Sequence, residues 1–186
     1  VLAYMWVSLV VDEDADFAEQ NRARLAPLMT PEQIGEAEQL AEEVPTLAAW
    51  KDGQGELRNY QRIRAKLGDR FTWIGGVGDD HVGGYYGIGI RRYTSSISSV
   101  APKLSILLHE AGASRDEETL AELTDRHVLP LYNLRTRCKG YEVSAMKALL
   151  DLRGMAGGPV RPPLVDLKPE EREELEPILD GWKEFL

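Results

Sequence analysis

The sequence predicts an α/β chain in which a short parallel sheet is followed by a long helical region. The first observation is an alternation of short apolar runs and helical periods between residues 46 and 97. The second is helical periodicity through most of the chain after Pro102,. The third is a helical pattern that precedes the first apolar run. We therefore expect three parts, over residues 1–44, 45–112 and 113–186.

Residues 1–44 read as two or three short helices joined by tight turns,. One of them starts with a capping signature, in which Thr30 is the N-cap, Pro31 takes the first helical position and Gln33 completes the capping box,. The strings "AYMWVSLV" and "DADFAEQNRARLAPLMTPEQIGEAEQLAEE" resemble the last repeat and trailing helix of a Sel-one-like, tetratricopeptide-type solenoid. Such repeats are stable only when several stack. We therefore expect a junction near residues 40–45.

The second part, residues 45–112, alternates short apolar runs with helical periods, which is typical of parallel strands joined by helices,. Gly68 is placed to end the first helix of this part, since glycine commonly follows a helix C-terminus,. The expected elements are strands over 46–50, 71–76 and 90–97, with helices over 57–68, 81–89 and 102–112.

The third part, residues 113–186, is expected to be helical apart from one extended connection. A helix starts at Ser114, with a capping box to Glu117, and runs towards "LYNLRTRC",. Another covers "YEVSAMKALLDLRG", and "KPEEREELEPILDGWKEFL" forms the last one. The Gly/Pro-rich stretch "GMAGGPVRPPLVD" between them predicts extended chain,.

The composition narrows the choice of partners and compartment. The net charge of −9 argues against nucleic acid, which needs a basic face, but leaves room for an anionic small molecule,. The single cysteine, Cys138, rules out an internal disulfide, suits a reducing compartment and is expected to be inert,. No run of about 18 apolar residues predicts a membrane span,. The apolar start lacks the basic region of a signal peptide, so the expected location is the cytoplasm,.

His81, His109 and His127 lack metal-ligand spacing and are expected to be structural or exposed,.

Four strings within residues 43–186 carry a resemblance to a known family: "WKDGQGELRNYQRIRAKLGDRFTWIGG", "YTSSISSVAPKL", "LYNLRTRCKGYEVSAMKALL" and "GGPVRPPLVDL". Together they resemble the C-terminal part of the 5-dehydro-4-deoxyglucarate dehydratases, a branch of the dihydrodipicolinate synthase and N-acetylneuraminate lyase superfamily. The resemblance implies a partial (β/α)8 barrel with a helical C-terminal extension. It puts "LAAW", "TWIGG" and "YTSS" on the sixth, seventh and eighth strands.

The resemblance implies that Lys51 is the family's Schiff-base lysine, directly after the sixth strand. A neutral amine there condenses with the carbonyl of a 2-oxo acid, and the resulting iminium is an electron sink for loss of a proton, a β-hydroxyl and carbon dioxide. The implied reaction converts 5-dehydro-4-deoxyglucarate, a 2-oxo dicarboxylate, to 2,5-dioxopentanoate without a cofactor or metal. An apolar barrel mouth would lower the pKa of the amine from about 10.4. The competing interpretation of Lys51 is a solvated residue at a loop edge.

The same resemblance suggests substrate-binding residues at the ends of the next two strands. Gly75 and Gly76 would let the backbone approach a bound carboxylate, and a tight turn explains them equally well,. Ser95 and Ser96 are candidate hydroxyl donors to the substrate, although alternation along a strand would let only one face the barrel,. The alternative is a hydrophilic strand end, and Thr94 has a weaker case.

A basic cluster of Arg135, Arg137 and Lys139 lies on a predicted helix. One interpretation is attraction of a dicarboxylate, or a subunit contact. The other is a solvated helix face whose cations pair with acidic residues, which the acidic composition favours,.

Two motifs of the family do not occur in these 186 residues. One is the Y-x-x-P motif that carries the proton-relay tyrosine before the lysine, and the other is the Thr-Thr pair that grips the substrate carboxylate. Three strands cannot close a barrel, so we expect a short three-stranded parallel sheet flanked by helices and incomplete activity in this chain alone.

Two other functions stay open. The chain could be a sister Schiff-base aldolase or lyase, such as a dihydrodipicolinate synthase-like enzyme, although Asp52 and the "RxKGY" and "GPVRPPL" blocks favour the dehydratase. It could instead be a non-enzymatic helical-repeat adapter with an inactive barrel fragment, an interpretation that rests on residues 1–44 alone. The resemblance also allows a homo-oligomer.

Overall fold

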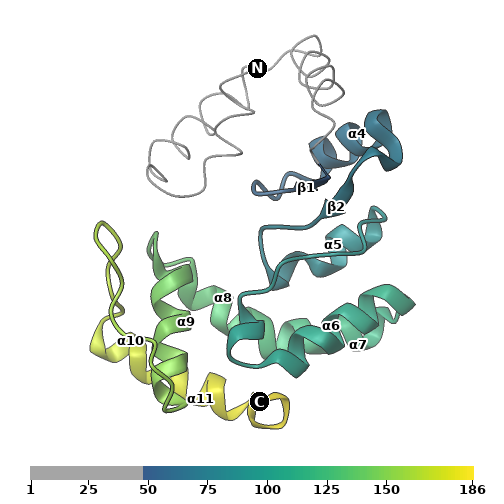
Figure 1. The fold of residues 1–186 in the computed structure, drawn as a ribbon. Helices are drawn as coiled ribbons and strands as arrows, with labels where there is room; N and C mark the ends of the chain where they lie inside the picture. Colours follow the sequence, from purple (N-terminus) through teal and green to yellow (C-terminus); the bar gives the residue numbers. More distant parts are fainter. Residues whose placement is uncertain (1–47) are drawn as a thin grey trace. The chain divides into compact units, whose positions relative to one another are not determined.

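A computed structural model describes residues 48–186, so the helical segment expected over 1–44 lies outside the described residues. The chain divides into two compact units, the first ending at Trp73 and the second spanning Ile74–Leu186 (Figure 1). The boundaries expected at residues 45 and 113 stay predictions.

The described part of the first unit is a strand–helix–strand segment, as the sequence predicts. Strand β1 (Ala49–Lys51) and strand β2 (Thr72–Ile74) form a two-stranded sheet, and the backbone N–H of Thr72 donates to the carbonyl of Ala48 at 3.0 Å. Helix α4 (Leu57–Leu67) connects them, and Gly68 follows its C-terminus in a positive-φ conformation. The expected role of Gly68 is therefore confirmed.

Four aromatic side chains form the core of this strand–helix–strand segment. The ring of Trp73 lies 5.6 Å from Tyr60, 5.7 Å from Phe71 and 6.1 Å from Trp50, measured between ring centroids. The Tyr60 hydroxyl donates to the carbonyl of Trp50 at 3.0 Å, and the Trp73 indole N–H donates to the carbonyl of Gly68 at 2.8 Å. These contacts join β1 and β2 to α4, because the polar ends of the rings bond to the backbone while their faces pack together.

The second unit begins at Ile74, the last residue of β2, and an isolated parallel β-bridge follows directly. Gly75 pairs with Tyr93, since its N–H donates to the carbonyl of Arg92 and its carbonyl accepts from the N–H of Thr94, both at 2.8 Å. The strand expected over 90–97 is reduced to this one bridge, so the three-stranded sheet is wrong for the described residues. The reason is local: Ser96 already has helical backbone angles, and its N–H donates to a side chain instead of a strand.

Seven helices make up about half of the second unit as the structure describes it. α6 packs on both α5 and α7, while α9 contacts both α8 and α11 (Figure 1). Fully buried side chains such as Leu104, Leu131 and Leu149 form the core between them. The helices are α5 (Val82–Gly87), α6 (Pro102–Ser114), α7 (Glu117–Leu123), α8 (Leu129–Arg135), α9 (Tyr141–Leu152), α10 (Pro169–Glu173) and α11 (Leu175–Asp180).

The helix expected to start at Ser114 differs from the prediction in its cap and in its continuity. The N-cap is Asp116, whose carboxylate accepts from the N–H of Thr119 at 3.0 Å, while the Ser114 hydroxyl donates back to the carbonyl of Glu110 at 2.7 Å. The capping box at Ser114 is therefore wrong. A π-turn over Thr124–Val128 separates α7 from α8. Pro130 explains why the π-turn lies here, because proline has no N–H to donate to the carbonyl four residues before it.

The C-terminal region keeps the predicted extended connection but breaks the predicted last helix. Residues 155–168 contain neither helix nor strand. The expected single helix is divided into α10, α11 and a 3-10 turn over Lys183–Phe185. Pro177 accounts for the first break, because it has no N–H for the carbonyl of Glu173 at the end of α10. Trp182 then fixes the end of the chain, since its buried indole donates to the carbonyl of His127 at 2.8 Å.

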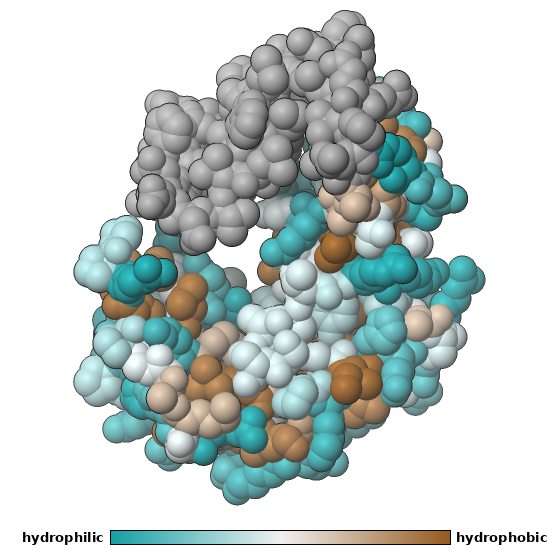
Figure 2. Space-filling model, viewed as in Figure 1, coloured by the Kyte–Doolittle hydropathy of each residue, from teal (hydrophilic) through white to brown (hydrophobic). Residues whose placement is uncertain are grey.

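Hydrophobic surface on the face shown in Figure 2 forms small separate patches among hydrophilic side chains. Such scattered apolar surface is ordinary for a folded protein. Among residues 48–186, the large hydrophobic side chains that are exposed are Ile106, Leu107, Leu129, Val143, Met155 and Val165.

Candidate functional site

Lys51 is the last residue of β1, at the end of the strand as the sequence predicts. The chain then turns sharply, because the buried carboxylate of Asp52 accepts from the N–H groups of Gln54 at 2.9 Å and Gly55 at 3.1 Å. The Lys51 side chain is exposed, and residues 48–73 do not supply the apolar walls that we expected around its amine. The structure thus confirms the place of Lys51 on the strand, and its Schiff-base role stays a prediction.

Gly75 and Gly76 lie at the end of β2, against the ring and hydroxyl of Tyr85. A Cβ on Gly75 would lie 2.3 Å from Cδ2 of the Tyr85 ring, so only glycine fits there. The N–H groups of Gly76 and Val77 both donate to the Tyr85 hydroxyl at 3.3 Å. The Tyr85 oxygen therefore lies where this backbone could otherwise hold an oxygen of a ligand. The Tyr85 ring thus explains the glycine at position 75 by packing, and the backbone N–H of Gly76 is used by the Tyr85 hydroxyl.

Asp79 is the centre of a buried polar network in the second unit, and sequence reasoning missed it. Its side chain is fully buried, and its carboxylate accepts from the Ser95 hydroxyl, from the N–H of Ile97 at 3.4 Å and from the Tyr132 hydroxyl at 3.1 Å. Burial raises the pKa of the carboxyl, and the hydrogen bonds from Ser95, Ile97 and Tyr132 oppose that rise,. The signal in the sequence was the pair of aspartates in "VGDD" soon after a strand.

Ser95 and Ser96 converge on this same carboxylate. The Ser96 N–H donates to Oδ2 of Asp79 at 3.2 Å and its hydroxyl donates to the same oxygen at 3.4 Å, while the Ser95 hydroxyl also contacts that of Ser105 at 2.7 Å. Both hydroxyls reach Asp79 because the backbone has left the extended conformation at Ser96. The structure thus brings the two predicted serines together around an aspartate that the sequence analysis did not single out.

Tyr132 and Arg135 of α8 complete the network from a distant part of the sequence. The Tyr132 hydroxyl accepts from the backbone N–H of Asp79 at 2.7 Å, and a Cβ on Gly78 would lie 2.3 Å from the Tyr132 oxygen. Burial, followed by the charge of Asp79, raises the pKa of Tyr132, so its hydroxyl stays protonated as a donor. Arg135 donates from Nη1 to the Ser96 hydroxyl at 2.8 Å and lies 4.5 Å above the Tyr132 ring.

The predicted basic cluster separates into members with different roles. Arg137 makes a bidentate ion pair with Glu174, at 2.7 and 2.8 Å, on the surface. This pairing raises the pKa of Arg137 and lowers that of Glu174, which fits the interpretation of a solvated helix face,. Arg135 instead points into the serine and aspartate network.

The three histidines lie apart from this network. The His81 ring nitrogen lies 3.0 Å from the Asp80 carboxylate, and the His109 ring bonds to the hydroxyl of Tyr86. His127 packs against Phe185, and burial lowers its pKa. Within residues 48–186 no three His, Cys, Asp or Glu side chains are grouped as a metal site would need.

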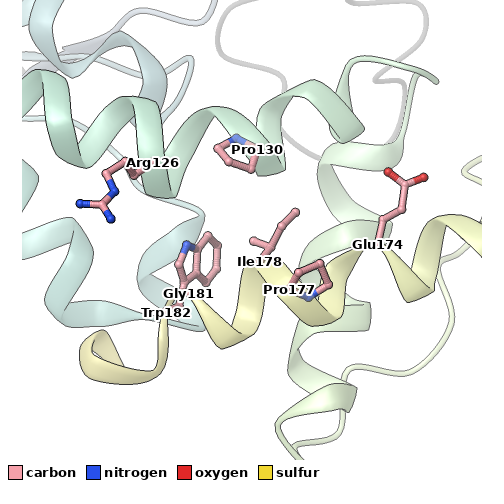
Figure 3. Close-up of a pocket in the computed structure, with 7 residues that line it drawn as sticks. All are labelled: Arg126, Pro130, Glu174, Pro177, Ile178, Gly181 and Trp182. Carbon is pink, nitrogen blue, oxygen red and sulfur yellow. The ribbon is translucent and has the colours of Figure 1, made fainter.

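The pocket in Figure 3 has a volume of about 420 Å³ and contains none of the predicted site residues. Arg126 and Pro130 form one wall, and Pro177 and Ile178 of α11 form the other (Figure 3). The buried Trp182 closes one end, so the pocket lies between the π-turn region and the divided C-terminal helices.

Residues 22–181 match the Dihydrodipicolinate synthetase family. This match starts inside the segment 1–44, so it is broader than the resemblance noted from residue 43 onwards. No helix in the described part of the chain combines the length and the apolar character needed to cross a bilayer.

Known relatives and solved structures agree with the family match. The chain is 39% identical over 144 residues to a 5-dehydro-4-deoxyglucarate dehydratase of Pseudomonas putida, covering 76% of this chain and 48% of the relative. A probable 5-dehydro-4-deoxyglucarate dehydratase of Allorhizobium ampelinum is also 39% identical, over 149 residues, which cover 79% of this chain and 50% of the relative. The chain thus spans about half the length of the curated relatives it matches.

Two solved structures show the same fold at low sequence identity. Dihydrodipicolinate synthase of Oceanobacillus iheyensis has a TM-score of 0.71 at 24% identity, covering 80% of this chain and 50% of that one. N-acetylneuraminate lyase of Proteus mirabilis has a TM-score of 0.68 at 21% identity, and the match covers 87% of this chain and 53% of that one. The described residues therefore share the fold of about half of each of these two proteins, which confirms the expected fold class in part. The family match and the relatives together show that the chain belongs to the dihydrodipicolinate synthetase family.

Proposed function

We propose that the chain carries the imine-forming part of a 5-dehydro-4-deoxyglucarate dehydratase. The observation that carries this proposal is its 39% identity to proteins of that name over about 150 residues, together with Lys51 at the end of β1. On this proposal β1, β2 and the bridge at Tyr93 correspond to the sixth, seventh and eighth strands of a complete barrel. Catalytic groups of such barrels lie at the C-terminal ends of the strands, which is where Lys51 stands.

The proposed reaction begins when the Lys51 amine attacks the keto carbon of 5-dehydro-4-deoxyglucarate and water leaves to form the imine. The protonated imine withdraws electrons from the neighbouring carbon, which loses a proton. The hydroxyl on the next carbon then leaves as water, which creates a double bond conjugated with the imine. The carboxyl group far from the keto carbon leaves as carbon dioxide, and its bonding electrons pass through this double bond to the iminium nitrogen. Protonation on carbon restores the imine and converts the enol at the other end into an aldehyde. Hydrolysis of the imine returns the amine of Lys51 and releases 2,5-dioxopentanoate. One water and one carbon dioxide are lost in each turnover.

The remaining site residues are proposed as binding groups for this 2-oxo dicarboxylate. The Ser96 hydroxyl accepts from Arg135, a cation that supports a role near a carboxylate, and the Ser95 hydroxyl donates to the same aspartate, Asp79, as Ser96. Gly75 and Gly76 act by keeping the end of β2 close to Tyr85, as their contacts support. A homo-oligomer and a cytoplasmic location remain part of this proposal.

A second candidate is another Schiff-base aldolase or lyase of the same family. It is favoured by the likeness in fold to N-acetylneuraminate lyase, which extends over 87% of the chain. The two candidates differ in their products, because an aldol reaction makes or breaks a carbon–carbon bond without releasing carbon dioxide. The helical-repeat adapter rests on residues outside the described part.

The test is carbon dioxide release from 5-dehydro-4-deoxyglucarate, with 2,5-dioxopentanoate identified by mass spectrometry. We expect residual release, in keeping with the incomplete activity expected of this chain, by the wild-type chain and by Lys103→Ala, an exposed lysine of α6, and none by Lys51→Ala. The Lys51 variant loses the nucleophile itself, so the loss should be complete. Release that is unchanged in Lys51→Ala would contradict the proposal, and aldol cleavage without carbon dioxide would favour the second candidate.

A further inference from the structure

The side of α6 that faces away from the core carries two large aliphatic side chains. Ile106 is 54% exposed and Leu107 is 38% exposed, whereas Leu108, the next residue, is fully buried. A spacing of three, four or seven residues keeps side chains on one side of a helix, so these two share a side with the residues three positions before and after them. We call this side the outer stripe of α6, and it consists of Lys103, Ile106, Leu107 and Glu110.

The two charges of the outer stripe have no partner within residues 48–186. Neither the ammonium of Lys103 nor the carboxylate of Glu110 takes part in the ion pairs of this part of the chain. Arg126 reaches Glu122 because the two residues are four positions apart on a helical stretch,. Lys103 and Glu110 are seven positions apart, which separates them by about 10 Å along the helix axis,. Opposite charges therefore stay unpaired at the two ends of an apolar pair.

The order of these charges also opposes the dipole of α6. The N-terminal end of a helix carries partial positive charge and favours acidic side chains, while the C-terminal end favours basic ones. Lys103 lies in the first turn of α6 and Glu110 lies towards its other end, and the helix has no acidic side chain in its first turn and no basic one in its last. The two charges thus do not stabilise the helix that carries them.

A second copy of α6, packed antiparallel on the outer stripe, would satisfy both charges. With a two-fold axis between Ile106 and Leu107, Ile106 of one copy meets Leu107 of the other. Lys103 of each copy then meets Glu110 of the other, so opposite charges pair at both ends of the stripe. Each Glu110 also lies near the N-terminal end of the opposite helix, where the dipole favours a carboxylate. A parallel pair would instead place like charges side by side.

We propose that the outer stripe of α6 is an interface through which two copies of this chain form a symmetric, antiparallel dimer. The proposal goes beyond the proposed function, which includes a homo-oligomer without naming a surface, and it does not depend on the chemistry of Lys51. One helix from each copy buries less area than a permanent interface, so the dimer should dissociate on dilution. The charge pairs lie on exposed surface, so added salt should weaken the association.

The test is sedimentation velocity on the full chain at concentrations from about 1 μM to about 1 mM, where we expect a monomer–dimer equilibrium. Ile106→Asp should keep the chain monomeric, because it would bury a carboxylate at the centre of the interface. Val143→Asp changes an exposed valine of α9 and is the matched control, which should dimerise as the wild type does. Circular dichroism checks that both variants keep the helical fold.

The charges give a sharper test of the antiparallel arrangement. Lys103→Glu leaves glutamates at both ends of each stripe and Glu110→Lys leaves lysines there, so each variant should raise the dissociation constant about tenfold or more. Combining Lys103→Glu with Glu110→Lys in one chain should recover the wild-type value. An equimolar mixture of the two single variants should form a heterodimer, because every charged contact then joins a lysine to a glutamate.

Several results would overturn the proposal. A chain that is monomeric at every concentration, or a dimer that survives Ile106→Asp, would exclude the outer stripe as the interface. Single charge variants that do not weaken the dimer, or that fail to associate when mixed, would exclude the antiparallel pairing. Imine formation at Lys51, trapped with borohydride and a 2-oxo acid, is measured separately on Ile106→Asp. An adduct in this variant would retain the dehydratase chemistry whatever the outcome for the dimer, so the two proposals fail separately.

Discussion

Asp79 brings a carboxyl group into the interior of the second unit, where only neutral groups donate to it. Burial raises its pKa above the usual value of 3.8. A carboxyl whose pKa is higher in the folded protein than in the unfolded protein contributes its full stability when the pH is below the pKa of the unfolded state. This contribution is lost as the pH rises through the pKa of the folded state. The buried network therefore couples stability to pH in the acid range.

Asp79→Asn removes this titration. The measured quantity is the free energy of unfolding of the wild type minus that of the variant. We expect this difference to fall as the pH rises from about 3.8, by at most about 1.4 kcal/mol per pH unit. Urea unfolding of both proteins across this range measures the difference. Carboxyls with lowered pKa values, such as Glu171 and Glu174, occur in both proteins and cancel. A difference that does not change with pH would contradict the account.

Gly75 is required by the ring of Tyr85. Gly75→Ala would place a methyl group 2.3 Å from Cδ2 of that ring, and overpacking of this kind costs about 1–3 kcal/mol of stability,. Gly87→Ala, at the end of α5, is the matched control, since its Cβ would meet nothing within 4 Å. Chemical denaturation should show a clear loss for the first variant and none for the second. Equal stabilities would show that the Tyr85 ring can move aside.

At the scale of elements, hydrophobic period and glycine placement predicted the strands and helices that depend on local sequence. β1, α4, β2 and α6 appear close to their expected positions because apolar spacing and a following turn define each of them,. The segment 90–97 reads as a strand but forms one bridge, because hydrogen bonds to Asp79 take the backbone N–H groups of Ser96 and Ile97. That competition comes from a side chain more than ten residues away, which no local pattern reveals.

The C-terminal segment depends on Trp182, which fixes its last turns to the π-turn. Trp182→Ala should cost about 3–5 kcal/mol in the free energy of unfolding, because the side chain is fully buried,. Trp182→Phe keeps most of the volume but leaves the carbonyl of His127 without its donor, so about 1–3 kcal/mol is expected,. Met155→Ala, at an exposed site, should change stability by about 0.5 kcal/mol or less,. A loss in Trp182→Ala as small as in Met155→Ala would contradict this role.

At the scale of the whole molecule, the sequence indicated where the site residues stand on the strands, but it could not reveal what joins them. Ser95 and Ser96 were found because the resemblance places these hydroxyls at the end of an expected strand. Tyr132 was missed because it lies 53 residues from Asp79 in the sequence and meets it only through the packing of α8. The basic cluster gave no hint that Arg135 and Arg137 would differ, since that depends on which face of the helix meets Ser96 or Glu174.

The family match supports the proposed function, in which Lys51 is the centre of the chemistry. The chain spans about half of its curated relatives, so the imine-forming lysine is a more direct subject for a test than full turnover. An amine that forms an imine can be reduced by borohydride to a stable secondary amine on the same residue.

The most direct measurement is borohydride reduction of the chain in the presence of 2-oxopentanoate, followed by peptide mass mapping. The account predicts one adduct, on Lys51, which is lost in Lys51→Ala and retained in Lys103→Ala. Adducts spread over the exposed lysines, an adduct that persists in Lys51→Ala, or no adduct at all would contradict it.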